Sequence, residues 1–441
     1  QNLAVAVNEA LHEMRQHQRE VIGTELTHRP RVLVFAYAAE PGRGSEPGAG
    51  WGVVRALGEM ADCTVLMAPE HSKAIHEWQS ESSGSNLSFV EVPEPALAPM
   101  AKWHRIPWFL VYLGWLRNAR AVAKKLHETA PYDATAHATY STYWLPTPAT
   151  QFGVPCLWGP VGGAVTTPLR LWPLLGWKGI FDEALDLFAV RLVALLPWTR
   201  RAWRGVTVPL VQNEETWKEL PKQLRARSWV LNHVVFTELP ETNPARRECH
   251  ILYFGSLESR KGPGLAIRGL VHANPEVSLK VIGDGPDRRR LERLARKLGV
   301  EERVEFLGFK PRSEVIQHVA GAAAVIFTGL REEGGMALAE AMMSGAPVIV
   351  LSHGGARTVA ASSTDPRRVA LVQPGSIGET ARRMGAAMTR FSSAPSGAKT
   401  PLLDQRAAND FLMHRLQDVV SVTEESTDAA LARAAALTGQ K

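Results

Sequence analysis

Two carboxylates stand eight residues apart around a glycine pair in the second half of the chain. Glu332 precedes Gly334 and Gly335, and Glu340 lies in the helix-forming run that follows them. Free backbone N–H groups at a helix start bind phosphate, and the helix dipole favours negative charge there. Carboxylates on either side can accept hydrogen bonds from sugar hydroxyls, so this spacing suits a nucleotide sugar, with Glu340 on the ribose and Glu332 on the hexose. Without further context, such a pair is also typical of a solvated helix face.

A second glycine-rich segment, residues 40–51, lies near the start of the chain. Gly44 and Ser45 are small enough to let the backbone approach a ligand closely at a helix start, so we expect this loop to cover the donor phosphates from the opposite lobe. A dinucleotide fingerprint is the rival interpretation. It requires a third glycine that the run beginning at Gly42 lacks.

The elements that position these segments form two similar series. Apolar runs without alternation, typical of buried parallel strands, recur between helical patterns in each half of the chain. The predicted strands are 31–38, 63–68, 87–92, 134–139, 155–158 and 206–211, and then 249–254, 278–282, 304–307, 324–328 and 347–351. This order predicts an α/β protein with two Rossmann-like lobes, in which ligands bind at the carboxyl ends of the strands.

The length of the chain and its turn-forming segments set the expected domains. The 441 residues suggest two or three domains, and a Pro-containing, charged linker at 234–248 marks a boundary. We therefore predict a helical N-terminal extension, an acceptor-side lobe, a nucleotide-sugar-binding lobe, and a C-terminal helix and tail that crosses back to the first lobe. Their ranges are 1–30, 31–240, 241–402 and 403–441.

Composition narrows the function classes further. With 45% hydrophobic and 21% charged residues, the chain is of the soluble globular type, and its net charge of +6 favours phosphates, anionic lipid or nucleic acid without choosing among them. Three distant cysteines fit a reduced cytoplasmic protein, and residues 1–30 show no export signal. No apolar stretch reaches the roughly 20 residues of a membrane span. No D-x-D triplet or metal-ligand cluster occurs, so we expect no metal.

Two segments, 100–126 and 169–205, combine tryptophan with arginine and lysine. Their tryptophans are Trp103, Trp108, Trp115, Trp172, Trp177, Trp198 and Trp203. Amphipathic helices of this composition can lie in a membrane interface, and they can equally pack on a sheet with their cationic ends in water. Both interpretations stay open at this point.

In its full context, the segment 331–349 resembles the E-x7-E motif of retaining GT-B glycosyltransferases of family 4. Glu340 begins the sequence Glu-Ala-Met-Met-Ser-Gly-Ala-Pro-Val-Ile, which keeps most of the second half of the family pattern. The first half reads Glu-Glu-Gly-Gly from Glu332, where the family commonly has Glu-Gly-Phe-Gly. The resemblance covers roughly residues 31–360 and leaves open which sugar is held.

The resemblance implies roles for further residues. Arg260 and Lys261 look like the family's two cations for the donor diphosphate, which would stabilise the leaving group; Ser256 stands where the family commonly has the first of them. His137 resembles a histidine near the sugar and acceptor, although a lone histidine beside an apolar strand is also typical of a core. The glycine-rich loop 158–163 resembles an acceptor-side loop. The implied catalytic residues are Glu332, His137, Lys261 and Arg260, and the implied donor-binding residues are Gly44, Ser45, Gly283, Phe309, Gly335, Met336, Ala337 and Glu340.

The function implied is metal-independent, retaining transfer of a hexose-type sugar from a nucleotide diphosphate-sugar to an acceptor hydroxyl. We expect no cofactor and no nucleic acid partner. The acceptor would be a glycan, a lipid-linked glycan or a small molecule, in the synthesis of surface polysaccharide, glycolipid or another glycoconjugate. The expected location is cytoplasmic, and the membrane interpretation of segments 100–126 and 169–205 would add peripheral contact with the anionic inner face of the membrane. A GT-B sugar-nucleotide epimerase or hydrolase, and a non-catalytic nucleotide-sugar-binding subunit, are the alternatives.

Overall fold

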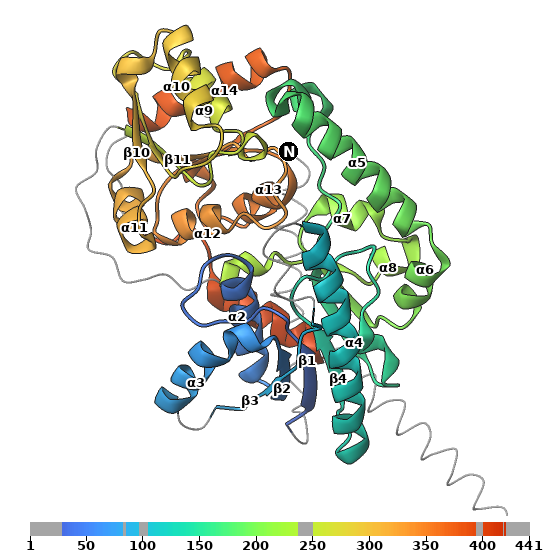
Figure 1. The fold of residues 1–441 in the computed structure, drawn as a ribbon. Helices are drawn as coiled ribbons and strands as arrows, with labels where there is room; N and C mark the ends of the chain where they lie inside the picture. The colour runs from blue at the N-terminus through green and yellow to red at the C-terminus, as the bar shows by residue number, and fades with distance from the viewer. Residues whose placement is uncertain are drawn as a thin grey trace, which may run out of the picture.

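The computed structural model describes residues 29–82, 85–96, 105–236, 250–393, 400–417 and 419. Nearly all of the predicted N-terminal extension, the predicted boundary at 240–241 and most of the C-terminal tail therefore lie outside the described residues. Two parallel sheets, each with helices along it, make up the two lobes (Figure 1). The prediction of an α/β protein with two Rossmann-like lobes is confirmed.

The first lobe is built on a seven-stranded parallel sheet with the order β3-β2-β1-β4-β5-β6-β7. Its inner strands are almost fully buried, which explains their unbroken apolar sequences. The strands are β1 (Arg31–Phe35), β2 (Asp62–Met67), β3 (Leu87–Glu91), β4 (Ala134–His137), β5 (Cys156–Val161), β6 (Val208–Val211) and β7 (Trp229–Val230). The helices are α2 (Ser45–Gly58), α3 (Ser72–Glu81), α4 (Arg105–Thr129), α5 (Gly176–Ala194), α6 (Pro197–Arg204), α7 (Glu214–Glu219) and α8 (Lys222–Arg225).

The second lobe contains a six-stranded parallel sheet with the order β10-β9-β8-β11-β12-β13. Its strands are β8 (His250–Phe254), β9 (Ser278–Ile282), β10 (Val304–Gly308), β11 (Ala324–Phe327), β12 (Val348–Leu351) and β13 (Val369–Val372). Its helices are α9 (Pro263–Leu270), α10 (Arg288–Lys297), α11 (Arg312–Gly321), α12 (Met336–Met343), α13 (Gly354–Ala361) and α14 (Ile377–Ser392). The sequence patterns miss the edge strands β7 and β13, because these are short and partly exposed.

The two lobes share a hydrophobic core and are joined again near the C-terminus. One buried cluster includes Leu210 of the first lobe and Leu338 of the second, together with Leu412. A helix at 405–417 lies against β7, where the Phe411 and Trp229 rings meet edge to face at 5.8 Å. Figure 1 shows this red segment beside the blue strands of the first lobe.

Helices α4 and α5, which come from the two segments that combine tryptophan with basic residues, occupy different environments. One face of α4 is buried in the first lobe through Tyr112 and Trp115. Helix α5 runs along the edge of the molecule from the second lobe towards the first (Figure 1). The turn before it, η4 (Leu169–Leu175), contributes Leu171 and Leu175 to the core cluster of the second lobe. Within the described ranges, no helix is both long and apolar enough to cross a bilayer.

Candidate active site

Most of the predicted donor-binding residues, and the predicted catalytic residues Lys261 and Glu332, lie at the carboxyl end of the second sheet. Lys261 follows β8, Gly283 follows β9, Phe309 follows β10, and Glu332 lies between β11 and α12. These strands are neighbours in the order β10-β9-β8-β11, so their loops open on the same edge. This is the position at which parallel α/β sheets bind ligands.

Lys261 and Glu332 form the central ion pair of this edge. The Lys261 ammonium donates to Glu332 Oε2 at 2.6 Å, and both side chains remain partly exposed. The Thr328 hydroxyl donates to the Lys261 backbone carbonyl at 3.0 Å, which ties the lysine's loop to the end of β11. Lys261, which we predict to bind the donor diphosphate, therefore contacts Glu332, which we predict to bind the hexose.

The start of α12 adds backbone donors to the same edge. Gly335 precedes the helix with φ of +86°, a conformation that favours glycine, and it supplies no side-chain cap to the helix. Met336 and Ala337 then open the first turn, whose N–H groups point towards the N-terminal end of the helix. Such an end can hold a phosphate.

Glu340 lies one turn further along α12 and is 7% exposed. Burial raises the pKa of its carboxyl, and Arg312 partly offsets that rise by donating from Nε to Glu340 Oε1 at 2.8 Å. Arg312 Nη1 also donates to the Gly42 carbonyl of the first lobe at 3.5 Å. Arg312 thus joins the carboxylate predicted for the ribose to the glycine-rich loop, a link that no sequence motif indicates.

The glycine-rich loop of the first lobe faces this arrangement. Gly44 immediately precedes α2 in an extended conformation, and a Cβ added there would meet no atom within 4 Å. Ser45 is the first residue of that helix. The open space around Gly44 suits a loop that covers a ligand, but no neighbouring atom in this structure would exclude a side chain at this position.

Gly283 and Phe309 behave differently at the ends of their strands. Gly283 has φ of +131°, and a Cβ there would collide with the Gly255 carbonyl, so glycine is required by the backbone itself. Phe309 is 79% exposed, which makes its ring available to a planar group. Their predicted contacts with a donor remain predictions.

The side chains of His137 and Arg260 have hydrogen-bond partners other than Lys261 and Glu332. His137, at the end of β4, is 2% exposed, with Nδ1 2.8 Å from the Thr147 hydroxyl and Nε2 3.2 Å from the Tyr112 hydroxyl. Burial lowers its pKa to about 4. Both ring nitrogens therefore have protein partners, as in a structural core histidine. Arg260 donates to Glu258 Oε2 at 2.8 Å on the surface.

Glu333, one of the two residues that depart from the family pattern, joins the two lobes. Its Oε1 accepts from the Val165 backbone N–H at 3.0 Å, and its Oε2 accepts from the Asn213 side chain at 2.8 Å. Burial raises the pKa of the Glu333 carboxyl, and hydrogen bonds from Asn213, Val165 and Gly163 only partly offset this rise. The loop predicted to lie on the acceptor side is thereby tied to the second lobe.

Two buried asparagines complete this interlobe network. The Asn213 carbonyl Oδ1 accepts from the Thr216 N–H at the start of α7, so its amide group must point towards Glu333. Asn232 donates to the backbone carbonyl of Gly334 at 3.0 Å. Asn213 carries a local helix-capping signal, but its contact across the lobes has no signature in the sequence.

Among the described residues, no three histidine, cysteine, aspartate or glutamate side chains are grouped as a metal site would require. The pairing of Lys261 with Glu332 and of Arg312 with Glu340 places cations beside both carboxylates of the motif. The chemistry available at this edge is therefore phosphate binding by cations and helix N–H groups, flanked by hydrogen-bond acceptors for hydroxyls.

Comparison of the coordinates with solved structures defines the class of protein. Sucrose-phosphate synthase from Thermosynechococcus elongatus aligns over 89% of this chain and all of its own, with a TM-score of 0.51 and 14% identity. This likeness concerns the fold alone, and together with the two facing Rossmann-like sheets it shows that the chain has the GT-B fold.

Sequence comparison then identifies the family represented in the second lobe. Residues 236–389 match the family described as "Glycosyl transferases group 1". The chain is 30% identical over 117 residues to the 2-deoxystreptamine glucosyltransferase of Streptomyces kanamyceticus and 34% identical over 113 residues to the D-inositol 3-phosphate glycosyltransferase of Xylanimonas cellulosilytica. These matches cover 26% and 25% of this chain, and 30% and 27% of the relatives.

Proposed function

We propose that the protein transfers a hexose-type sugar from a nucleoside diphosphate-sugar to an acceptor hydroxyl with retention of configuration and without a metal ion. The observation that carries the proposal is the contact between Lys261 and Glu332 beside the start of α12, with Glu340 on the same helix. The family match covers this whole region and supports the assignment to glycosyl transfer. The acceptor would belong to surface polysaccharide, glycolipid or other glycoconjugate synthesis.

In the proposed reaction, the bond between the anomeric carbon and the diphosphate oxygen breaks as the acceptor oxygen bonds to the same face of that carbon. The acceptor proton passes to the departing phosphate, so no protein nucleophile is needed. Lys261 and the N–H groups at the start of α12 stabilise the negative charge of the leaving diphosphate. Glu332 accepts from hexose hydroxyls, and Glu340, oriented by Arg312, accepts from the ribose.

A panel of nucleotide sugars tests donor binding, since a ligand that binds only the folded protein raises its melting temperature. A stabilising donor is then used to compare the wild type with Lys261→Met. We expect nucleoside diphosphate release with acceptor to fall about 100-fold or more, because one electrostatic donor to the transition state is lost. Arg289→Met is the matched control, since Arg289 is an exposed cation of α10 outside the predicted site.

The same assay separates the alternatives. Wild-type turnover in Lys261→Met would contradict the proposed role of this lysine. Free, altered sugar formed from the donor alone would favour an epimerase or hydrolase. Donor binding that depends on Glu340, without turnover with any acceptor, would favour a non-catalytic subunit.

Helix α5 supports a second proposal, peripheral contact with an anionic membrane. Its outward side carries exposed apolar residues at helical spacing, namely Trp177, Phe181, Leu185, Phe188 and Leu192. Its inward side instead places Glu183 and Asp186 against Arg331, at 3.3 and 2.9 Å. A surface helix normally shows the opposite arrangement, with its apolar side inward. The outward apolar side of α5 is the side that a membrane interface would cover.

Flotation with liposomes tests this contact directly. We expect the protein to float with vesicles that contain anionic lipid at low salt, and to float less with neutral vesicles. Failure to float with anionic vesicles at low salt would overturn the proposal. The membrane contact and the transfer reaction are tested separately, because donor binding is measured without lipid.

A further inference from the structure

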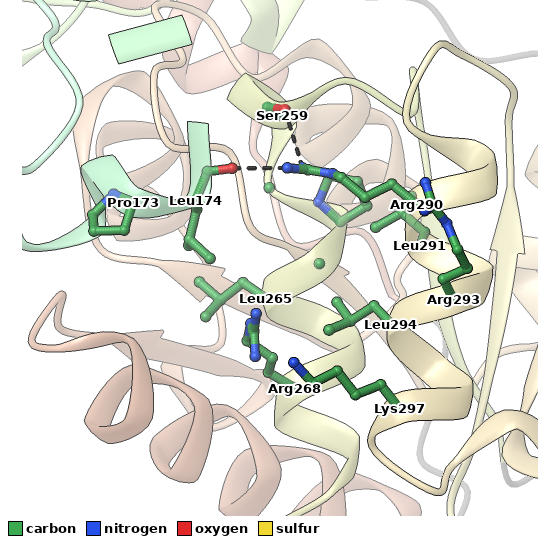
Figure 2. A pocket seen from close by; sticks show the side chains of 13 residues that line it. Pro173, Leu174, Ser259, Leu265, Arg268, Arg290, Leu291, Arg293, Leu294 and Lys297 are labelled. Atoms are coloured by element: carbon green, nitrogen blue, oxygen red, sulfur yellow. Dashed lines mark hydrogen bonds between the residues drawn. The ribbon is translucent and has the colours of Figure 1, made fainter. Parts of the chain in front are cut away.

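A basic pocket of about 440 Å³ lies outside the predicted donor site, between η4, α9 and α10. Figure 2 shows Pro173 and Leu174 on one side of it and side chains of α9 and α10 on the other. None of the residues predicted to bind the donor lines this pocket. The first lobe's η4 and the second lobe's helices thus enclose a separate space.

The charged residues that line the pocket are all basic. Its charged lining residues are Arg268, Arg290, Arg293 and Lys297. Arg290 is held by Asp287 and by the Ser259 hydroxyl, both at 3.1 Å. In the described part of the chain, Arg268, Arg293 and Lys297 form no ion pair with a carboxylate. Three cations are therefore available to an anionic ligand.

Arg268 gives an additional indication of a ligand. Its Nε is buried and has no hydrogen-bond partner within the protein. Buried donors are normally satisfied, and leaving one without an acceptor is destabilising. An anion in the pocket would supply the missing acceptor.

The remaining wall of the pocket is apolar. Leu174, Leu265 and Leu294 contribute most visibly to this wall in Figure 2. A ligand that matches both surfaces has an anionic head and a hydrocarbon portion. Free inorganic phosphate would satisfy the cations but not the leucines.

The pocket is also close to the exposed apolar side of α5. Leu174 lies three residues before Trp177, which is 85% exposed, so their Cα atoms are at most about 11 Å apart. A membrane that covered Trp177 and Phe181 would bring lipid headgroups to the height of the pocket, where the charges are complementary.

We propose that this pocket binds the phosphate headgroup of an anionic phospholipid, with Arg268 and Lys297 on the phosphate and the leucines against the start of the acyl chains. This inference rests on the proposed membrane contact of α5 and specifies the lipid chemistry that the contact selects. The shared chemistry is a phosphate group, which a lipid headgroup or a free phosphate could provide.

The test is the binding of short-chain phosphatidic acid below its micelle concentration, measured by calorimetry and compared with inorganic phosphate. We expect saturable binding of the lipid by the wild type, and about tenfold or greater weakening in the double variant Arg268→Gln/Lys297→Gln, because each cation near a lipid phosphate contributes about 1 kcal/mol. The matched control is Arg289→Gln/Arg296→Gln, which removes the same charge from the exposed side of α10 without changing the pocket. Unchanged melting temperatures show that both variants fold.

Each outcome decides the proposal. Selective weakening by the pocket variant supports it, whereas equal weakening by both variants would show that only overall charge matters and would overturn it. Equal affinity for inorganic phosphate and for the lipid would assign the pocket to a free phosphate ligand instead. If substitutions of Trp177 and Phe181 abolish flotation while the pocket variant floats and binds lipid normally, the membrane contact stands and the headgroup site fails.

Discussion

Helices α4 and α5 both contain tryptophan and basic residues, but they occupy opposite environments. Both combine tryptophan with arginine or lysine, and both were open to interpretation as core or as membrane-contacting segments. In α4, Trp115 is fully buried and meets the Tyr37 ring edge to face at 5.1 Å. In α5, Trp177 and Phe181 are exposed.

The difference lies in what each helix packs against. Beneath α4, the end of the first sheet presents the aromatic rings of Tyr37 and Tyr140, which match an apolar helix face. Beneath α5, the second lobe presents Arg331, which draws Glu183 and Asp186 inward and leaves the apolar side outward. An amphipathic pattern therefore indicates that a helix has two sides, but the neighbouring residues decide which side is buried.

The largest effect that would sharpen this comparison is expected in the core of α4. Trp115→Ala should lower the free energy of unfolding by about 3–5 kcal/mol, because it leaves a cavity against Tyr37. Urea titration measures the change. Trp115→Phe is the control and should lose less than about 2 kcal/mol, since most of the packing remains. A loss below about 1 kcal/mol in the alanine variant would show that α4 is not the core helix described.

The next effect concerns pH and the contact of α4 with His137. Burial lowers the pKa of His137 to about 4 from the ordinary 6.5, so the unfolded state binds the proton more readily. The contribution of neutral His137 to the free energy of unfolding is complete above pH 6.5. It is lost as the pH falls from 6.5 to 4, by at most about 1.4 kcal/mol per pH unit. His137→Gln should flatten the pH dependence of stability over this interval, whereas His76→Gln on the surface should not. Parallel curves for the wild type and His137→Gln would refute the assignment of a neutral core histidine.

A smaller effect is expected at the inner side of α5. Arg331→Met leaves the Glu183 and Asp186 carboxylates without their cation and should lower the free energy of unfolding by about 1–3 kcal/mol. Chemical denaturation measures it, with Arg331→Lys as the variant that keeps the charge. A stable methionine variant would mean that the ion pairs do not hold α5 in place.

The smallest effect on stability, and the clearest difference from α4, is expected on the outer side of α5. Trp177→Ser/Phe181→Ser should change the free energy of unfolding by less than about 0.5 kcal/mol, since both side chains are exposed. The same variant should no longer float with anionic liposomes. Leu110→Ser, at an exposed apolar position of α4, is the control and should float normally. Normal flotation of the α5 variant would remove the proposed membrane role of this helix.

Much of the fold could be predicted because parallel strands have a local signature. Continuous apolar runs indicate strands buried on both faces, and they locate most strands of both sheets. The edge strands β7 and β13 lack that signature because they are exposed on one side. The contact between the Trp229 and Phe411 rings places the C-terminal helix on β7. These residues are far apart in the chain, so no local pattern predicts the contact.

The candidate site also combines features that the sequence predicts with contacts that it does not predict. The spacing of Glu332 and Glu340 and the glycine before α12 are local features, so the motif indicated a phosphate and sugar site before any coordinates. The partners Arg312 and Asn213 are not local to their carboxylates. They were found only from the folded chain.

Local patterns in the chain predict most helices and strands and the residue types at the carboxyl edge of the second sheet, because each pattern depends on neighbours a few positions apart. The folded chain alone shows that Lys261 contacts Glu332, that Glu333 joins the lobes, that His137 lies in the core and that α5 turns its apolar side outward. Burial and ion pairing cannot be read from local patterns, because they depend on which distant residues the fold brings into contact.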